Sequence, residues 1–367
     1  MQLIATKATT INVSGHDGLT LTNTGNTKVT TFDASGVTNS NAIATDTAAK
    51  MAVTFTSANT SVAAQVSITG GAGDDVLQGN VGIDTIAGGS GADTITATAG
   101  NDVSTGGAGN DTFAFTEALL IANSGTTATF DGGAGTDILD FNEDAVINIV
   151  DADFRGITSV ETLTTGDGVN NVVLGASADA TGITAVTGGT GADTLDLSSV
   201  DFDNAVTITG ADGDDVITLA AGTDQVATVV TADTAANNNA AGGDVITGFT
   251  SGTDKLNIDA LGAATAITDG EAAITIAANT VFFFSAADAG GTYAVETSAN
   301  VILWINALAT VTDTAATAHL IIVDETEANA ALYQWLGDGI GNEATGDTLT
   351  LMATFDAALV AGDLLFA

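Results

Sequence analysis

The chain of 367 residues contains no cysteine and no proline. The absence of cysteine excludes a disulfide framework and thiolate metal sites. The absence of proline leaves every backbone N–H available for strand pairing. Lysine and arginine together number 5 against 45 aspartate and glutamate residues, which gives a formal net charge of −40. This balance argues against nucleic-acid binding, which needs basic residues to displace counterions from phosphates, and it favours cations as partners.

Long apolar runs are also missing. No stretch approaches 18 consecutive apolar residues, so no membrane span is expected, and the negative charge argues against docking to an anionic membrane. Residues 1–15 lack a charged segment followed by an apolar run, so no secretory signal peptide is expected there. Hydrophobic residues still make up 45% of the chain, which predicts a packed core rather than a disordered coil.

Glycine is abundant, with 44 residues, and much of it falls in a nine-residue repeat. Residues 70–114 read GGAGDDVLQ, GNVGIDTIA, GGSGADTIT, ATAGNDVST and GGAGNDTFA without interruption. The eighth position is apolar in four of these five nonads, Ser104 being the exception. The sixth position is always an aspartate: Asp75, Asp84, Asp93, Asp102 and Asp111.

The same unit returns later as isolated copies. GGAGTDILD, GGTGADTLD and GADGDDVIT begin at Gly132, Gly188 and Gly210, and LAAGTDQVA follows the last of them directly. Their acidic positions are Asp137, Asp193, Asp215 and Asp224. Weaker echoes of the form Gly-x-Asp-x-apolar contain Asp17, Asp244 and Asp254.

The nonad has a direct physical interpretation. Its glycine-rich first part predicts a turn, because glycine adopts positive φ without steric cost. Its x-apolar-x ending predicts a short strand with one inward side chain. One such unit cannot close a core, whereas stacked copies can, and stacking places a carboxylate in a column at every turn. The carboxylates of this column repel one another unless a cation lies among them. Calcium fits better than magnesium, because it accepts mixed carboxylate and carbonyl oxygens in flexible geometry.

The pattern GGxGxDx-apolar-x resembles the calcium-binding nonapeptide of the repeats-in-toxin (RTX) family, whose repeats form a parallel β-roll. The resemblance implies an ion-binding turn in the first six residues and a strand in the last three. It implies bound Ca²⁺ ions, with turn carbonyls assisting these aspartates: Asp75, Asp84, Asp93, Asp102, Asp111, Asp137, Asp193, Asp215, Asp224, Asp244 and Asp254. The alternative, glycine–aspartate loops without metal, stays open mainly for the isolated copies and the echoes.

The expected fold class is all-β: a parallel β-roll or β-helix solenoid closed by an antiparallel β cap. We expect an N-terminal β-rich segment at 1–69, a calcium-binding roll with interspersed coils at 70–243, and a cap with a secretion signal at 244–367. Period-two alternation of Thr and Val before and after the repeats predicts short strands, in a solenoid or a β-sandwich. Residues 231–243 are the candidate linker, and 244–261 resembles the stretch that closes RTX domains.

Aromatic residues are concentrated in residues 262–367. HLIIVDE, ALYQWLGD and LTLMATFD alternate in a way that predicts antiparallel strands with one buried face. Residues 300–308 are expected to form a helical turn or a strand. Trp304 and Trp335 are interpreted as core or cap residues, with a carbohydrate platform as the less favoured alternative. The final residues, Asp363 followed by Leu-Leu-Phe-Ala, resemble the uncleaved export signal of type I secretion substrates.

No catalytic pattern is present. The sequence contains neither H-E-x-x-H nor G-x-S-x-G, and its two histidines, His16 and His319, lie in different segments. The strong bases are too few to clamp phosphates. The chain is therefore not expected to be an enzyme.

Lysine, proline and charged side chains normally protect exposed strand edges from pairing with other chains. The near absence of lysine and proline here favours a protein that assembles with itself. The Ala/Thr/Gly/Asp-rich composition, as in ITSVETLTTGDG and GADTLDLSSV, resembles that of calcium-dependent surface-layer (S-layer) proteins of Gram-negative bacteria. That resemblance implies a structural protein at the cell surface that folds and assembles on binding calcium. Its expected partners are further copies of itself and a surface polysaccharide. The alternative is a secreted calcium-dependent adhesin or filament subunit.

Overall fold

The computed structural model of the chain forms two compact units, residues 1–166 with 176–186, and residues 167–175 with 187–367. It describes residues 7–21, 23, 26–39, 47–123, 128–141, 146–199, 202–220, 226–230, 244–250, 253–257, 274–276, 281–285, 311–313, 317–324, 329–336, 348–357, 359 and 364–365. The expected domain boundaries at 69/70 and 243/244 stay predictions.

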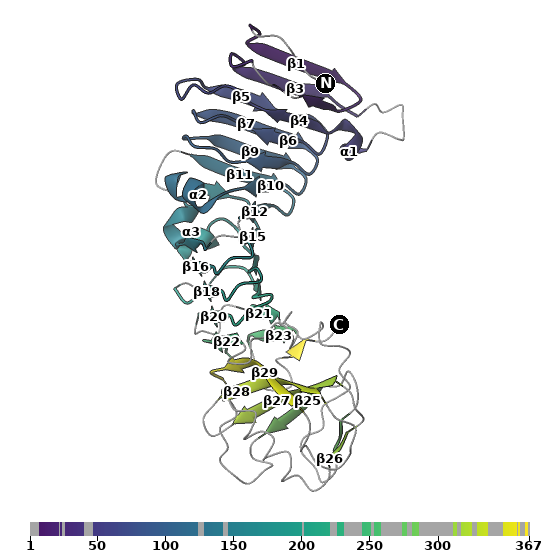
Figure 1. Cartoon of the computed structure of the whole chain (residues 1–367), viewed down its shortest axis with the longest axis vertical. Helices are drawn as coiled ribbons and strands as arrows, with labels where there is room; N and C mark the ends of the chain where they lie inside the picture. Colours follow the sequence, from purple (N-terminus) through teal and green to yellow (C-terminus); the bar gives the residue numbers. More distant parts are fainter. Residues whose placement is uncertain are drawn as a thin grey trace. The chain divides into compact units, whose positions relative to one another are not determined.

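Two parallel sheets run side by side through the first unit (Figure 1). The first sheet has the order β1 (Thr10–Gly15), β3 (Thr31–Val37), β5 (Val66–Thr69), β7 (Asp84–Ser90), β9 (Val103–Ala108), β11 (Thr129–Ala134) and β14 (Ile157–Thr158). The second includes, in order, β2 (Leu19–Leu21), β4 (Val53–Thr56), β6 (Val76–Gln78), β8 (Thr94–Thr96), β10 (Thr112–Ala114), β12 (Ile138–Asp140) and β15 (Thr162–Thr164). Two further short strands of this part of the chain are β13 (Asn148–Ile149) and β17 (Ala185–Thr187).

Successive strands alternate between the two sheets, so one coil of the chain contributes one strand to each. Within the tandem repeats one coil is two nonads long, since Thr85 pairs with Val103 and Thr94 with Thr112. The turns of alternate nonads therefore lie on opposite edges of the stack. The repeat of nine residues in the sequence becomes a structural repeat of 18 residues.

The core of this unit lies between the two sheets. The eighth positions of the nonads point inward from both sides, and Leu77, Ile95 and Phe113 form one continuous buried column. Burial of one such side chain contributes about 1.5–3 kcal/mol. Ser104, the exception in the apolar pattern, is also buried and pairs with Phe130, so a small side chain lies beside a large ring.

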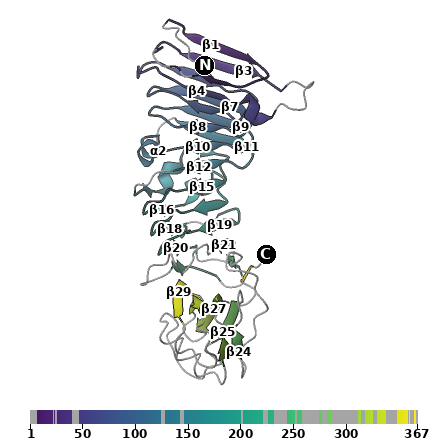
Figure 2. The ribbon, with the colours of Figure 1, turned by 45° about the vertical axis from the view of Figure 1, so that its right-hand side comes forward.

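Short helices interrupt the coils, and the sequence patterns did not predict them. They are α1 (Ala48–Met51), α2 (Glu117–Asn123), the 3₁₀ helix η1 (Asp151–Phe154) and α3 (Ala176–Asp179). Helices α1 and α2 lie on opposite sides of the stack in both ribbon views (Figures 1 and 2). The Thr47 hydroxyl caps α1 by accepting a hydrogen bond from the backbone N–H of Lys50 at 3.3 Å. These helices therefore lie in the connections between strands, and the strand pairing of both sheets continues across them.

The second unit continues the parallel pattern with short strands. One sheet of this unit runs through β16 (Asn171–Val173), β18 (Thr194–Asp196), β20 (Val216–Thr218), β22 (Asp244–Thr247), β29 (Thr348–Phe355), β28 (Asn329–Leu336), β27 (Thr317–Asp324) and β25 (Val281–Ser285). Beside it are β19 (Val206–Thr209), β21 (Ala227–Val230), β23 (Lys255–Asn257) and β30 (Leu364–Leu365), and the pair β24 (Ile274–Ile276) and β26 (Val311–Asp313).

The all-β class, the parallel roll and the antiparallel C-terminal strands are confirmed. Strands β27, β28 and β29 pair antiparallel as expected, while β25 joins β27 in parallel. The expectation of one buried face is wrong for β28, where the consecutive residues 330–333 are all buried. The reason is that this run, Ala-Ala-Leu-Tyr, is apolar at every position and belongs to an internal strand.

Residues 231–243 and 300–308, with Trp304, lie outside the described residues. Trp335 lies in β28. Among the described residues, no helix combines the length and the apolar character that crossing a membrane requires.

Candidate metal centre

The two edges of the first unit differ in chemistry, and the difference begins in the sequence. We call the turns 70–75, 91–93, 109–111 and 135–137 the acidic edge. They connect the first sheet to the second and end at the sixth position of alternate nonads. We call the turns 57–65, 79–83 and 97–102 the neutral edge; these connect the second sheet back to the first, and their one charged residue, Asp102, is buried.

Along the acidic edge the position-six aspartates form a continuous ladder. The backbone N–H of Asp75 donates to Oδ1 of Asp93 at 2.8 Å, and that of Asp93 donates to Oδ1 of Asp111 at 2.8 Å. Asp111 donates in turn to Oδ1 of Asp137 at 2.7 Å, across a gap of 26 residues. Each carboxylate therefore holds the preceding coil in register. All four side chains are buried.

The ladder ends at a residue that the sequence analysis missed. The backbone N–H of Asp137 donates to Oε2 of Glu161 at 2.7 Å. Glu161 directly precedes the strand Thr-Leu-Thr, just as Asp93 directly precedes Thr-Ile-Thr. The signal was an acid before an x-apolar-x strand, without the glycines that mark the consensus nonad.

The second oxygen of each carboxylate distinguishes the members of this ladder. The Oδ2 atoms of Asp93, Asp111 and Asp137 are buried and, within the described part of the chain, have no hydrogen-bond partner. A buried carboxylate oxygen without a partner is costly, and it points to a cation. In Asp75, by contrast, Oδ2 accepts the backbone N–H of Gly71 at 2.6 Å.

Glycine shapes the space that these oxygens face. A Cβ on Gly88 would lie 2.2 Å from Oδ2 of Asp93 and 2.6 Å from the carbonyl oxygen of Gly106 in the next coil. The arrangement recurs at Gly106, with Oδ2 of Asp111 at 2.2 Å and the carbonyl oxygen of Gly132 at 2.6 Å. One carboxylate and one backbone carbonyl thus face each glycine. This is the mixed oxygen donor set that calcium takes, so Asp93 and Asp111, with the glycine carbonyls opposite them, fit the ion.

Burial and like charge raise the pKa values of these aspartates. Desolvation, reinforced by the charges of Asp75 and Asp111, raises the pKa of Asp93 to about 7. Desolvation and the neighbouring Asp137 raise the pKa of Asp111 to about 6, and the pKa of Asp137 itself is raised mainly by burial. A cation in the column would favour the charged forms and reverse these shifts.

The aspartates beside the neutral edge have different surroundings. Asp84 accepts the backbone N–H groups of Val66 at 3.1 Å and Asn80 at 2.5 Å, one on each oxygen. Asp102 accepts the backbone N–H of Asp84 at 2.9 Å and the hydroxyl of Thr98 at 3.1 Å. Both oxygens of each carboxylate are therefore satisfied by protein donors. A metal ion would have to displace them, so these two residues fit calcium less well.

Asparagine side chains connect the coils at and beside the neutral edge. The Nδ2 of Asn80 donates to the carbonyl of Ala64 at 3.3 Å, and that of Asn59 donates to the carbonyl of Val29 at 3.3 Å. Each Oδ1 accepts a backbone N–H two residues ahead, from Gly82 and Ser61. Asn26 repeats both contacts in the preceding coil with Ala8 and Lys28. These side chains link consecutive coils without a cation.

The second unit has ladders of its own. The backbone N–H groups of Asn170, Asp193 and Asp215 donate to Oδ1 of the next member, at 2.8, 2.8 and 3.0 Å, and the last acceptor is Asp244. Asp254 accepts the N–H of Ala227 at 2.9 Å. Sequence reasoning thus found the acids of this ladder and Asp254, but not Asn170.

Two candidates do not enter a described ladder. Asp224 lies outside the described residues. Asp17, one of the weak echoes, is 77% exposed and forms an ion pair with Lys50 at 3.3 Å. Nowhere among the described residues do three carboxylate or imidazole side chains converge on one point. A bound ion therefore completes its coordination with backbone carbonyls.

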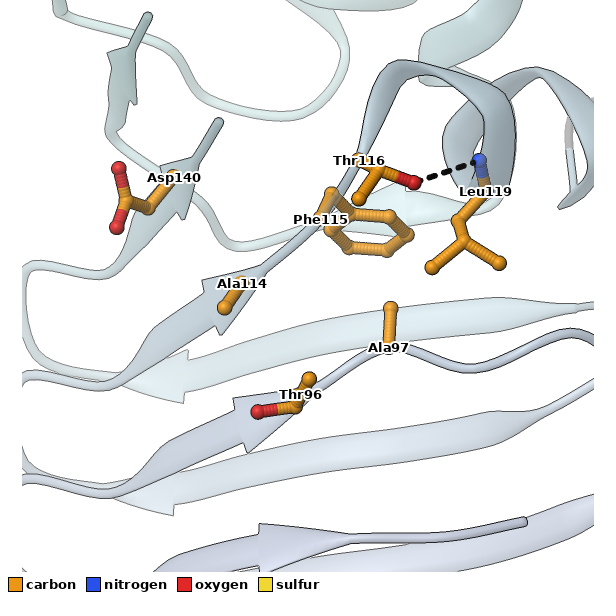
Figure 3. A pocket seen from close by; sticks show the side chains of 7 residues that line it. All are labelled: Thr96, Ala97, Ala114, Phe115, Thr116, Leu119 and Asp140. Carbon is orange, nitrogen blue, oxygen red and sulfur yellow. Dashed lines mark hydrogen bonds between the residues drawn. The ribbon is translucent and has the colours of Figure 1, made fainter. Parts of the chain in front are cut away.

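A small pocket lies beside α2, about 170 Å³ in volume (Figure 3). It is lined by Thr96, Ala97, Ala114, Phe115, Thr116, Leu119 and Asp140. Its lining contains one titratable group, Asp140, whose pKa is raised by burial. A single carboxylate among apolar and hydroxyl groups does not make a catalytic pair, and it provides too few ligands for a metal.

Stacked parallel coils, each with a buried carboxylate ahead of its strand, define a calcium-binding β-roll. Comparison with known families matches residues 67–82, 78–113 and 205–226 to the RTX calcium-binding nonapeptide repeat (4 copies). The chain therefore carries RTX repeats, which bind Ca²⁺ in multiple sites. RTX repeat proteins are in general secreted, and their repeats are typically structural calcium-binding modules. No curated protein matches the chain.

Proposed function

We propose that this protein is a structural, self-assembling surface-layer protein of a Gram-negative bacterium, folded and assembled by extracellular calcium. The observation that carries the proposal is the acidic-edge ladder. Asp93, Asp111 and Asp137 each use one oxygen to hold the preceding coil and keep a second, buried oxygen for a cation. The ligand residues in this proposal are Asp93, Asp111 and Asp137, with Asp75 and the ladder of the second unit as further candidates.

Calcium acts as the switch for folding. Without the ion, the buried like charges along the edge oppose stacking, and the net charge of −40 keeps the chain expanded. Extracellular calcium modules have dissociation constants of roughly 10⁻⁴–10⁻³ M. Calcium that binds the folded form alone stabilises it by mass action. The chain thus stays extended where calcium is scarce and folds outside the cell.

Open strand edges support the assembly step. Among the described residues, β1 and β2 each pair on one side, with β3 and β4. Strand β1 reads Thr-Ile-Asn-Val-Ser-Gly and contains neither the lysine nor the proline that usually guards an edge. Within the described part of the chain its outer N–H and C=O groups are open, and they can pair with another copy. A surface polysaccharide is proposed as the anchor of the assembled layer.

Electron microscopy of the purified chain at low micromolar concentration tests this function. Calcium is raised from chelated to about 10 mM, above the range typical of extracellular modules, with magnesium as the ion control. Sheets that appear with calcium alone are the expected result. A matched pair of variants, Asp111→Asn and Asp102→Asn, separates the ladder from general charge effects, since the first is expected to raise the calcium requirement more.

Other outcomes would contradict the proposal. A chain that folds with calcium but stays monomeric would disprove assembly and point to a secreted adhesin. Filaments instead of sheets would replace the layer with a fibre. Identical behaviour in chelator and in calcium would disprove the calcium switch itself.

A further inference from the structure

The turns of the neutral edge lack exposed charged side chains, although the molecule as a whole is strongly acidic. Its turns, residues 57–65, 79–83 and 97–102, contain no lysine or arginine and a single acid, Asp102, although the chain has 45 acids. Asp102 and Asp84, which directly follows the second turn, are buried and held by backbone and hydroxyl donors. Their charges therefore do not reach the surface of this edge.

Large apolar side chains are exposed on the same edge. Val62 is 74% exposed, Val81 50% and Ile83 46%. The turns that carry them are stacked directly, because a Cβ on Gly82 would lie 2.5 Å from the carbonyl oxygen of Ala64. The three side chains therefore form one patch across two consecutive coils.

Further exposed apolar side chains lie on the same side of the stack, beyond the neutral edge and in connections that also carry acids such as Glu117 and Asp151. Val103 begins the strand after the third neutral turn, and Ile121 lies on α2 in the corresponding connection of the next coil. Val146 and Val150 lie in the connection after that one, and all four side chains are exposed. Within the first unit, the described large apolar residue that is exposed away from this side of the stack is Val76, on β6. Single exposed apolar residues need no explanation, whereas a contiguous group marks an interaction site.

The patch sits on a rigid, metal-independent support. Asn59 and Asn80 connect their turns to the preceding coil and fix the backbone of their own turn. A surface that is already ordered loses little conformational entropy on binding. This edge is consequently suited to a persistent contact rather than to a transient one.

We infer that the neutral edge is the surface to which a second copy of this chain docks. Two copies each carry a charge of −40, so like-charge repulsion is weakest where both surfaces lack acids. A basic partner would instead be drawn to the acidic surfaces. Contact between apolar side chains on turns without exposed charge supplies the hydrophobic contribution. The inference rests on the proposed self-assembly and adds a lateral contact surface to the open edges of β1 and β2.

Charge placed in the patch tests the inference. The double variant Val81→Asp/Ile83→Asp puts two carboxylates into each copy of the contact. Val76→Asp is the matched control, because Val76 is 44% exposed but lies outside the neutral edge. Sedimentation velocity of the full chain in saturating calcium measures association, while circular dichroism and calcium titration report folding. We expect the double variant to associate at least about tenfold more weakly, and the control to behave as the original chain does.

The outcomes separate this inference from the proposed function. If the original chain stays monomeric in calcium, self-assembly fails and the inference fails with it. If the original chain and the folded double variant assemble equally, the neutral edge is not the docking surface while self-assembly stands. Should the double variant not fold, Val62→Asp replaces it, since Val62 is the most exposed member of the patch. Unchanged assembly of that variant would equally overturn the inference.

Discussion

At the scale of the residue, the sixth-position aspartate of a nonad has two oxygens with different surroundings. On the acidic edge Oδ1 is committed to a coil-to-coil hydrogen bond, and Oδ2 of Asp93, Asp111 and Asp137 is directed at a glycine. Beside the neutral edge both oxygens of Asp84 and Asp102 are taken by the protein. The same residue type at the same position of the repeat therefore has two roles.

Replacement by asparagine separates these roles. Asp111→Asn keeps an oxygen for the coil-to-coil bond but removes the charge, and we expect roughly tenfold weaker calcium binding or the loss of one site. Asp102→Asn is the control, because the hydroxyl of Thr98 can rotate to accept from the new amide. Isothermal titration calorimetry measures stoichiometry and affinity. Equal losses in both variants would mean that both edges bind calcium.

The raised pKa values predict how pH acts on the protein. Asp93 and Asp111, with pKa values of about 7 and about 6 against an ordinary 3.8, hold protons more tightly when folded than when unfolded. In chelator, folding therefore takes up protons, and the free energy of unfolding decreases as pH rises from about 4 to about 7. Thermal unfolding across this range measures the slope. A stability that increases with pH in chelator would contradict the assignment.

Calcium is expected to invert this dependence. The ion requires deprotonated carboxylates, so its affinity increases over the same pH range and its binding releases protons. Calorimetry in two buffers of different ionisation enthalpy counts the protons released. Binding without proton release near pH 6 would contradict the involvement of these aspartates.

At the scale of the element, the nonad predicted the short strands well. Its x-apolar-x ending corresponds to β6, β8, β10, β12, β18 and β20. The period of nine did not reveal that alternate copies occupy opposite edges, because that depends on closing a coil between two sheets. It also did not reveal Glu161, whose turn lacks the consensus glycines. Helix α2 was missed since its seven residues are inserted between strands of regular spacing.

A turn glycine on the acidic edge is expected to be essential. In Gly106→Ala the new Cβ would overlap Oδ2 of Asp111 and the carbonyl oxygen of Gly132, which destabilises by about 1–3 kcal/mol and displaces both oxygens. Gly15→Ala is the control, because its Cβ meets nothing within 4 Å and costs only backbone strain at φ 143°. We expect calcium affinity to fall in the first variant and to stay unchanged in the second.

At the scale of the whole molecule, the negative net charge and bound calcium have opposite effects on how compact the chain is. A charge of −40 on 367 residues expands the unfolded chain, and bound calcium compensates it locally along the ladders. We expect the hydrodynamic radius to decrease sharply with millimolar calcium and less with magnesium. Sodium chloride at about 0.5 M screens charge without coordinating it and is expected to give partial compaction at most. Size-exclusion chromatography with light scattering measures all three, and full compaction by salt alone would contradict a specific ion effect.

The alternation of nonads between two edges has a consequence for how such a gene can change. Loss of a single nonapeptide would transfer every later acid to the opposite edge and break the ladder from Asp93 to Asp137. Loss or duplication of 18 residues, one full coil, preserves it. The insertion that contains α2 widens one interval to 26 residues yet leaves the parity intact. One full coil is therefore the unit that can be gained or lost, and recombination is expected to add or remove nonapeptides in pairs.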